Sequence, residues 1–157
     1  MPFRMELVAG NSRDILAAIA VDDRDGLDDR ARFPAHLSLG GVLDPTWLDL
    51  YSEAIRAVTG RSQPRDFIDA RAELDGSADQ AGTTIERIDP AWITAIARTD
   101  DGQIDAIAGR WIDLVEEEVG ELPREEKPWI RNLAAEIVDF ARRADRSSDV
   151  LLAWSLT

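Results

Sequence analysis

The last residues of the chain constrain its fold more than any other segment. Residues 150–156 read Val-Leu-Leu-Ala-Trp-Ser-Leu, which is a nearly continuous apolar run. Such a run is typical of a strand buried on both faces, because a strand with one solvated face alternates apolar and polar residues. We therefore expect an interior strand, in one small sheet with the segments 35–39 and 83–88. Alternating apolar residues over 1–7 predict a further short strand at the N-terminus.

Helical periodicity fills most of the remaining chain. Apolar residues recur at intervals of three and four over 45–58, 104–119 and 127–141, and shorter patterns predict helices after Asn11, over 90–98 and over 65–74. The segment 76–82 is expected to be a loop. The predicted class is α+β: a predominantly α-helical single globular domain over residues 1–157, with a small sheet of short strands that includes the apolar C-terminal strand.

Few side chains suited to covalent or acid–base chemistry are present. The 157 residues include one histidine, one tyrosine, one lysine and no cysteine. The absence of cysteine excludes disulfides, thiolate metal ligands and a thiol nucleophile. No glycine-rich phosphate loop, Gly-x-Ser-x-Gly elbow or His-Glu-x-x-His helix occurs. We therefore predict no catalytic residue, no metal and no cofactor, and a protein that is more consistent with binding than with catalysis.

The net charge of the chain limits which classes of macromolecule it is expected to bind. The formal net charge is −13, with acids spread evenly along the chain. An acidic surface repels phosphates, which disfavours nucleic acids and anionic membranes and favours a basic protein partner. No apolar run approaches the roughly 20 residues that a membrane helix requires. We expect a cytoplasmic bacterial protein, and the sequence leaves homo-oligomerisation open.

Two acidic stretches invite a ligand site, although solvated surface explains each of them. Residues 22–26 resemble part of a calcium loop, but Val21 and Arg32 would occupy two of its liganding positions, so a polar, exposed acidic loop over 22–29 is preferred. Residues 116–118 and 125–126 are glutamates on either side of a predicted turn. Paired carboxylates can hydrolyse glycosides, but a run of acids is more typical of a solvated helix face.

Four residues are candidates for binding. His36 is the only imidazole, and its apolar neighbours favour a packed position over a ligand site. Asp44 and Asp89 each precede a proline at a helix start, where capping explains an aspartate. Tyr51 could join His36 and Asp44 in a cleft. Of the five tryptophans, four fall in apolar or amphipathic elements, whereas Trp129 could lie at the surface in a protein-binding patch.

The order of elements from Thr83 onward resembles that of the YfbM-like family of small bacterial proteins. The similarity lies in a strand, a helix starting at Asp89-Pro90-Ala91-Trp92, a long helix, a further helix ending at 141–144 and the strand Val150-Leu151-Leu152-Ala153-Trp154. It covers about half of the chain and involves no diagnostic motif. It implies an α+β fold, and it supplies no catalytic residues, because the family has no settled activity.

The favoured hypothesis is a non-enzymatic protein-interaction module, and one version of it is an acidic inhibitor or immunity-type protein that presents carboxylates to a basic target. The alternative is a small-molecule-binding domain or a carboxylate-based enzyme with a cleft near His36. A purely architectural subunit is the third hypothesis.

Overall fold

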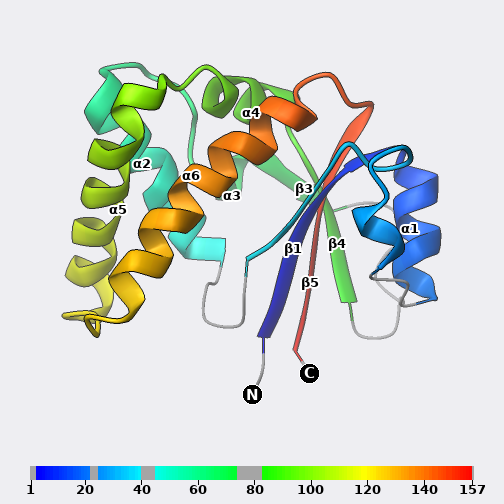
Figure 1. The fold of residues 1–157 in the computed structure, drawn as a ribbon, viewed down its shortest axis with the longest axis horizontal. Coiled ribbons are helices and arrows are strands. Elements are labelled where there is room, and N and C mark those ends of the chain that lie inside the picture. Colours follow the sequence, from blue (N-terminus) through cyan, green and yellow to red (C-terminus); the bar gives the residue numbers. More distant parts are fainter. Residues whose placement is uncertain (1–2, 22–24, 40–44, 74–82, 157) are drawn as a thin grey trace. The chain divides into compact units, whose positions relative to one another are not determined.

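The computed structural model describes residues 3–21, 25–39, 45–73 and 83–156, and it has the predicted α+β class (Figure 1). The backbone divides into two compact units. One unit contains residues 1–44, 71–90 and 143–157, and the other contains residues 45–70 and 91–142. The first is built around the sheet, and the second is made of helices.

The sheet has five antiparallel strands within the described residues, in the order β2-β1-β5-β4-β3. The strands are β1 (Phe3–Gly10), β2 (Ala35–Ser38), β3 (Arg71–Glu73), β4 (Thr83–Ile88) and β5 (Asp149–Leu156). The C-terminal strand β5 lies between β1 and β4, as Figure 1 shows. The prediction of an interior C-terminal strand is therefore confirmed, although the 35–38 strand pairs with β1 rather than with β5.

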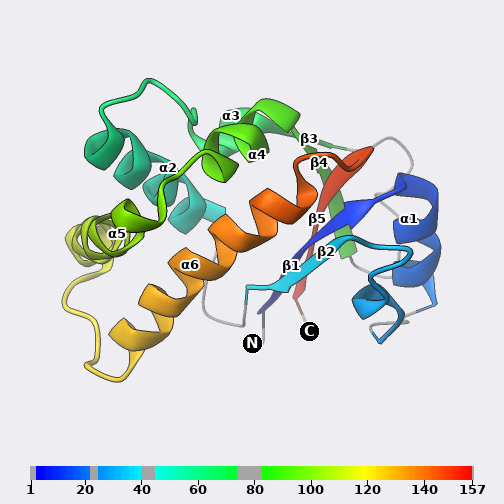
Figure 2. The same ribbon diagram turned by 45° about the horizontal axis from the view of Figure 1, so that its top comes forward.

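Helix α1 (Ser12–Ala20) packs on one face of this sheet (Figure 2). Asn11 caps it, because the Asn11 side chain accepts a hydrogen bond of 2.9 Å from the amide of Arg13. Its buried face contributes Ile15, Ala18 and Ile19 to a cluster with Val8, Ile85, Leu151 and Ala153 of the sheet. Burial of these side chains is the main source of stability for the packing of α1 on the sheet.

The segment after α1 returns to the same face of the sheet. It contains the short 3-10 helix η1 (Gly26–Asp28), and its side chains Leu27 and Phe33 are fully buried in the α1 cluster. Gly10 allows this close approach: its φ is +153°, and a Cβ there would lie 3.1 Å from the carbonyl oxygen of Arg32. The prediction of a polar, exposed loop over 22–29 is therefore wrong in part, because Leu27, in its second half, is buried in the core.

The opposite face of the sheet is also apolar. Met5, Leu7 and Leu152 are buried there, on the positions that alternate with Val8 and Leu151. Trp154 shares this face but is only half-buried. Its indole N–H donates a hydrogen bond of 2.8 Å to Glu86, which also pairs with Arg71 at 3.3 Å.

The helical unit contains α2 (Pro45–Thr59), α3 (Phe67–Ala70), α4 (Pro90–Ala97), the 3-10 helix η2 (Asp101–Gln103), α5 (Ile104–Val119) and most of α6 (Glu126–Ala144). The predicted helices over 45–58, 90–98, 104–119 and 127–141 are therefore confirmed. The predicted helix over 65–74 is wrong in its second half, because Arg71–Glu73 is a strand. The predicted loop over 76–82 and the capping residue Asp44 lie outside the described residues.

Polar groups on large aromatic side chains connect α2 to its neighbours. Trp111 of α5 donates from its indole nitrogen to the carbonyl oxygen of Trp47 at 2.8 Å. Trp92 of α4 donates to the hydroxyl of Ser52 at 2.9 Å. Buried polar atoms of this kind are costly unless paired, so these bonds fix how the helices dock.

None of the helices within the described ranges combines the length and the apolarity that crossing a membrane requires.

We predict that Ile15→Ala lowers the free energy of unfolding by about 2–5 kcal/mol, because it leaves a cavity between α1 and the sheet. Ile68→Ala is the matched control: Ile68 is also helical but 56% exposed, and its replacement should change stability by less than about 0.5 kcal/mol. Urea unfolding monitored by tryptophan fluorescence measures both. Equal losses in the two variants would contradict the described packing of α1.

Candidate functional site

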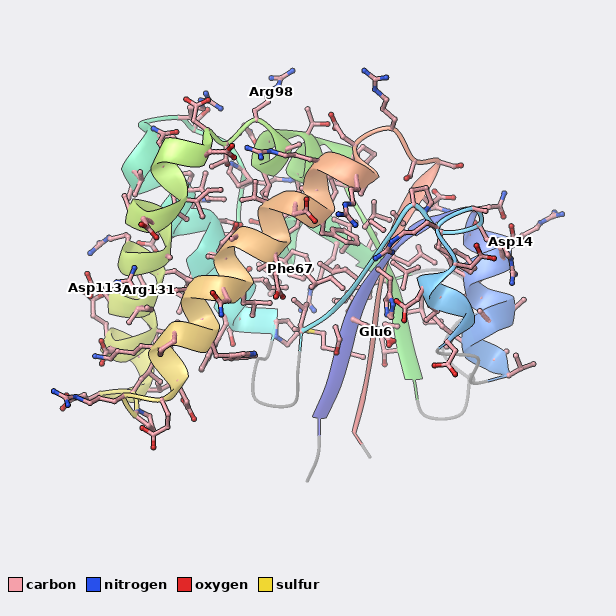
Figure 3. All side chains as sticks on the ribbon, in the orientation of Figure 1. Glu6, Asp14, Phe67, Arg98, Asp113 and Arg131 are labelled. Atoms are coloured by element: carbon pink, nitrogen blue, oxygen red, sulfur yellow. The ribbon has the colours of Figure 1, made fainter. Side chains whose placement is uncertain are left out.

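His36 lies between two carboxylates that come from different elements of the sheet unit. Its Nδ1 atom is 2.8 Å from Oδ1 of Asp28 in η1, and its Nε2 atom is 3.7 Å from Oε1 of Glu6 in β1. His36 projects from β2 opposite Val8, which places it on the same face as Glu6. Figure 3 labels Glu6 on the side of β1 where η1 lies. We call Glu6, Asp28 and His36 the histidine cluster.

The three side chains of the histidine cluster differ in how far they are buried. The side chain of His36 is 11% exposed and that of Glu6 is 4% exposed, whereas that of Asp28 is 65% exposed. A separation of 3.7 Å is too long for a hydrogen bond, so Glu6 acts on the ring as a nearby charge, and Nε2 makes no hydrogen bond to a described residue. Asp28 makes the strong, charge-assisted contact.

Two opposing effects set the protonation of the ring. Burial alone lowers the pKa of His36, but the neighbouring carboxylates Glu6 and Asp28 raise it by more, so the pKa lies above the ordinary value of 6.5. A protonated ring can direct one N–H toward each carboxylate. The cluster therefore suits a held cation, because a ring that already carries both protons cannot accept another from a substrate.

Tyr51 is a core residue of the helical unit. It is fully buried, its hydroxyl donates a hydrogen bond of 2.9 Å to the carbonyl oxygen of Ala134, and its ring meets that of Trp111 edge-on at 4.8 Å. Burial raises the pKa of the Tyr51 hydroxyl well above its ordinary value. A phenol in this state holds α2 to α6 and does not ionise near neutral pH. Tyr51 and His36 belong to different units.

Asp44 and Trp129 are the two remaining binding candidates. Asp44 lies outside the described residues. Trp129 lies in the first turns of α6 and is half-buried, so part of its indole reaches solvent. Among the described residues, no group of three histidine or acidic side chains has a geometry that could hold a metal ion.

Glu116 connects the end of α5 to the turn between α5 and α6 and to the start of α6. Glu116 accepts a hydrogen bond of 3.0 Å from the amide of Leu122 and pairs with Lys127 at 3.6 Å. Gly120 ends α5 with a φ of +89°, a conformation that favours glycine. These contacts hold the chain in one path from α5 to α6.

Four more glutamates are exposed at the end of α5 and on the turn that follows it: Glu117, Glu118, Glu121 and Glu125. We call these four residues the acidic turn. Their side chains form no ion pair or hydrogen bond with any residue in the described part of the chain. Their charge is therefore available to a partner.

Sequence reasoning found His36 but missed both of its partners. Glu6 resembles an outward-facing residue of an alternating strand, and Asp28 resembles one more acid of a solvated turn. The signal that could have found them is weak: a carboxylate on a strand face that also carries Val8 must have a polar partner if that face is covered.

We predict that His36→Gln destabilises the protein more at low pH than at high pH. The pKa of His36 in the folded protein is raised above the unfolded value of 6.5, so its contribution is fully present below pH 6.5 and is lost as the pH rises through the folded pKa. Below pH 6.5 the expected loss is about 1–3 kcal/mol. Urea unfolding of both proteins between pH 5.5 and 8.5 measures it. A difference that stays constant or grows with pH would contradict this assignment.

We predict that Tyr51→Phe lowers the free energy of unfolding by about 0.5–1.5 kcal/mol, because one buried hydrogen bond to Ala134 is lost while the ring is kept. Thermal and urea unfolding measure the effect. An unchanged stability would mean that the hydroxyl is not structural, and would return Tyr51 to the list of binding candidates.

Comparisons of the chain with protein-family models, with curated proteins and with solved structures find no match. The resemblance in layout to the YfbM-like family stays a prediction.

Proposed function

We propose that this chain is a non-enzymatic protein-interaction module that binds a basic protein through the acidic turn. The observation that supports the proposal is the state of Glu117, Glu118, Glu121 and Glu125: they are exposed, they have no partner among the described residues, and they lie on an ordered turn. Charges that are already held in place lose less conformational entropy on binding than charges on a flexible segment.

The charge balance of the turn favours a cationic partner. Residues 116–127 contain six glutamates against Arg124 and Lys127, and Lys127 is paired with Glu116. Such a surface attracts arginine- and lysine-rich surfaces and can raise association rates by roughly 10 to 1,000-fold at low salt. The half-buried indole of Trp129 near the start of α6 adds an aromatic group of the kind that is enriched in interfaces.

The side chains with catalytic potential support the same reading. His36 lies between two carboxylates, and the buried hydroxyl of Tyr51 donates its hydrogen bond to a carbonyl oxygen in the core. The alternative of a small-molecule site or carboxylate-based enzyme near His36 therefore has less support in the geometry. Within the proposed class, an inhibitor or immunity-type protein would use the acidic turn to cover the phosphate-binding arginines and lysines of its target.

The test is a charge-reversal pair with a matched control. Glu117→Lys with Glu121→Lys changes the acidic turn, and lysine near the C-terminus of α5 suits the helix dipole, so folding should be preserved. Glu53→Lys with Glu136→Lys makes the same change in net charge at exposed positions of α2 and α6. All three proteins are used as bait in cytosol from the native source, and retained proteins are identified by mass spectrometry.

We expect the wild type and the control pair to retain one basic protein in stoichiometric amount, and to lose it as the salt concentration rises. The acidic-turn pair should retain at least tenfold less of it. The purified partner should then bind the wild type in isothermal titration with the same order of preference. Retention of no basic protein, or equal retention by both charge-reversed pairs, would overturn the proposal.

A further inference from the structure

We propose that His36 is a proton-dependent latch that holds residues 26–33 against the sheet. This inference is independent of the proposed function, because it concerns the sheet unit alone. Within the segment, the amide of Asp29 bonds to Gly26 at 3.1 Å and the amide of Phe33 bonds to Asp29 at 2.8 Å. These bonds shape the segment, but they do not tie it to the sheet.

Apolar and ionic contacts of the described residues both attach the segment to the sheet. The first is apolar: Leu27 and Phe33 are fully buried against Val8 and its neighbours. The second is ionic: the carboxylate of Asp28 lies 2.8 Å from Nδ1 of His36 on β2. The apolar contact does not depend on pH. The ionic contact does, because its strength depends on the charge of the ring.

The geometry favours a proton on each ring nitrogen. A separation of 2.8 Å requires a hydrogen between Nδ1 and the carboxylate of Asp28. In the neutral ring that hydrogen would leave a lone pair on Nε2, pointing toward the buried carboxylate of Glu6 at 3.7 Å. Two electron-rich groups facing each other repel. The imidazolium removes this repulsion and strengthens the bond to Asp28 at once.

The charged groups around the ring come from two elements. Glu6 faces it from β1 and Asp28 faces it from η1, and both raise the pKa of His36 against the lowering effect of burial. The neighbouring charges are engaged elsewhere: Asp29 accepts a hydrogen bond of 3.0 Å from the amide of Ala31, and Arg32 lies 5.0 Å from the centre of the Phe33 ring. On α1, Arg13 and Asp14 are both exposed.

Loss of the proton therefore weakens the attachment without removing the apolar contact. The segment is expected to open locally more often at high pH, which exposes Leu27 and Phe33 transiently while β1, β4 and β5 stay paired. Local opening of this kind has its own free energy, distinct from that of global unfolding.

Amide hydrogen exchange on the full-length protein at pH 5.5 and 8.5 tests the latch. Protection is corrected for the intrinsic effect of pH on exchange. The reporting amides are those of Asp29 and Phe33, because a segment this short is not expected to keep its internal bonds once it leaves the sheet. The amides of Leu151 and Ala153 in β5 are the reference. In the wild type we expect the protection of the reporters to fall on the order of tenfold relative to the reference between the two pH values.

Two variants separate the latch from a general effect of pH. His36→Gln should remove most of the pH dependence at the reporters. Asp28→Asn changes an exposed side chain, so it should fold even if the first variant does not, and it should lower reporter protection at pH 5.5 while reducing the change with pH. An unchanged wild-type protection ratio between the two pH values would overturn the latch. So would an equal tenfold change in Asp28→Asn.

Discussion

The sheet depends on the pairing of β5 with strands on both of its sides. β5 pairs with β1 from Phe3 to Gly10 and with β4 from Thr83 to Arg87. Without it, β2 with β1 and β4 with β3 would be two separate two-stranded ribbons, and such ribbons are marginally stable at best in water. β5 also supplies Leu151 and Ala153 to the cluster under α1. Because β1 begins the described chain and β5 ends it, the sheet is completed through long-range pairing, which is slow to form.

Around this sheet and within the helical unit, the scarce polar side chains serve structure. The single histidine joins η1 to β2, the single tyrosine joins α2 to α6, and Trp92 and Trp111 direct their indole N–H groups to partners on α2. Arg142 plays a similar part: its guanidinium bonds to the carbonyl oxygens of Ala97 and Thr99 and to Asp101 at the end of α4. The four glutamates of the acidic turn have no such partner among the described residues, and this contrast motivates the assignment of binding to them.

The sequence predicts the helices and strands far better than it predicts which strands pair and which side chains meet. The apolar run at 150–156 and the three- and four-residue spacing in α2, α5 and α6 depend on burial alone, so they are legible without a structure. The strand Arg71–Glu73 is not, because its pairing with β4 overrides a local helical pattern. The histidine cluster is equally hidden: Asp28 is eight residues from His36 and Glu6 lies on another strand, and only the sheet register and the return of η1 bring the three together.

The central claim of this account is that the only imidazole of the chain is a cation clamped by two carboxylates, and not a free base. The most direct measurement is nitrogen-15 NMR of the imidazole ring at pH 6.5, where a single histidine needs no assignment. The account predicts that most of the ring is imidazolium, with protons on both nitrogens, because the pKa of His36 lies above 6.5. A predominantly neutral ring with one bare nitrogen would contradict it.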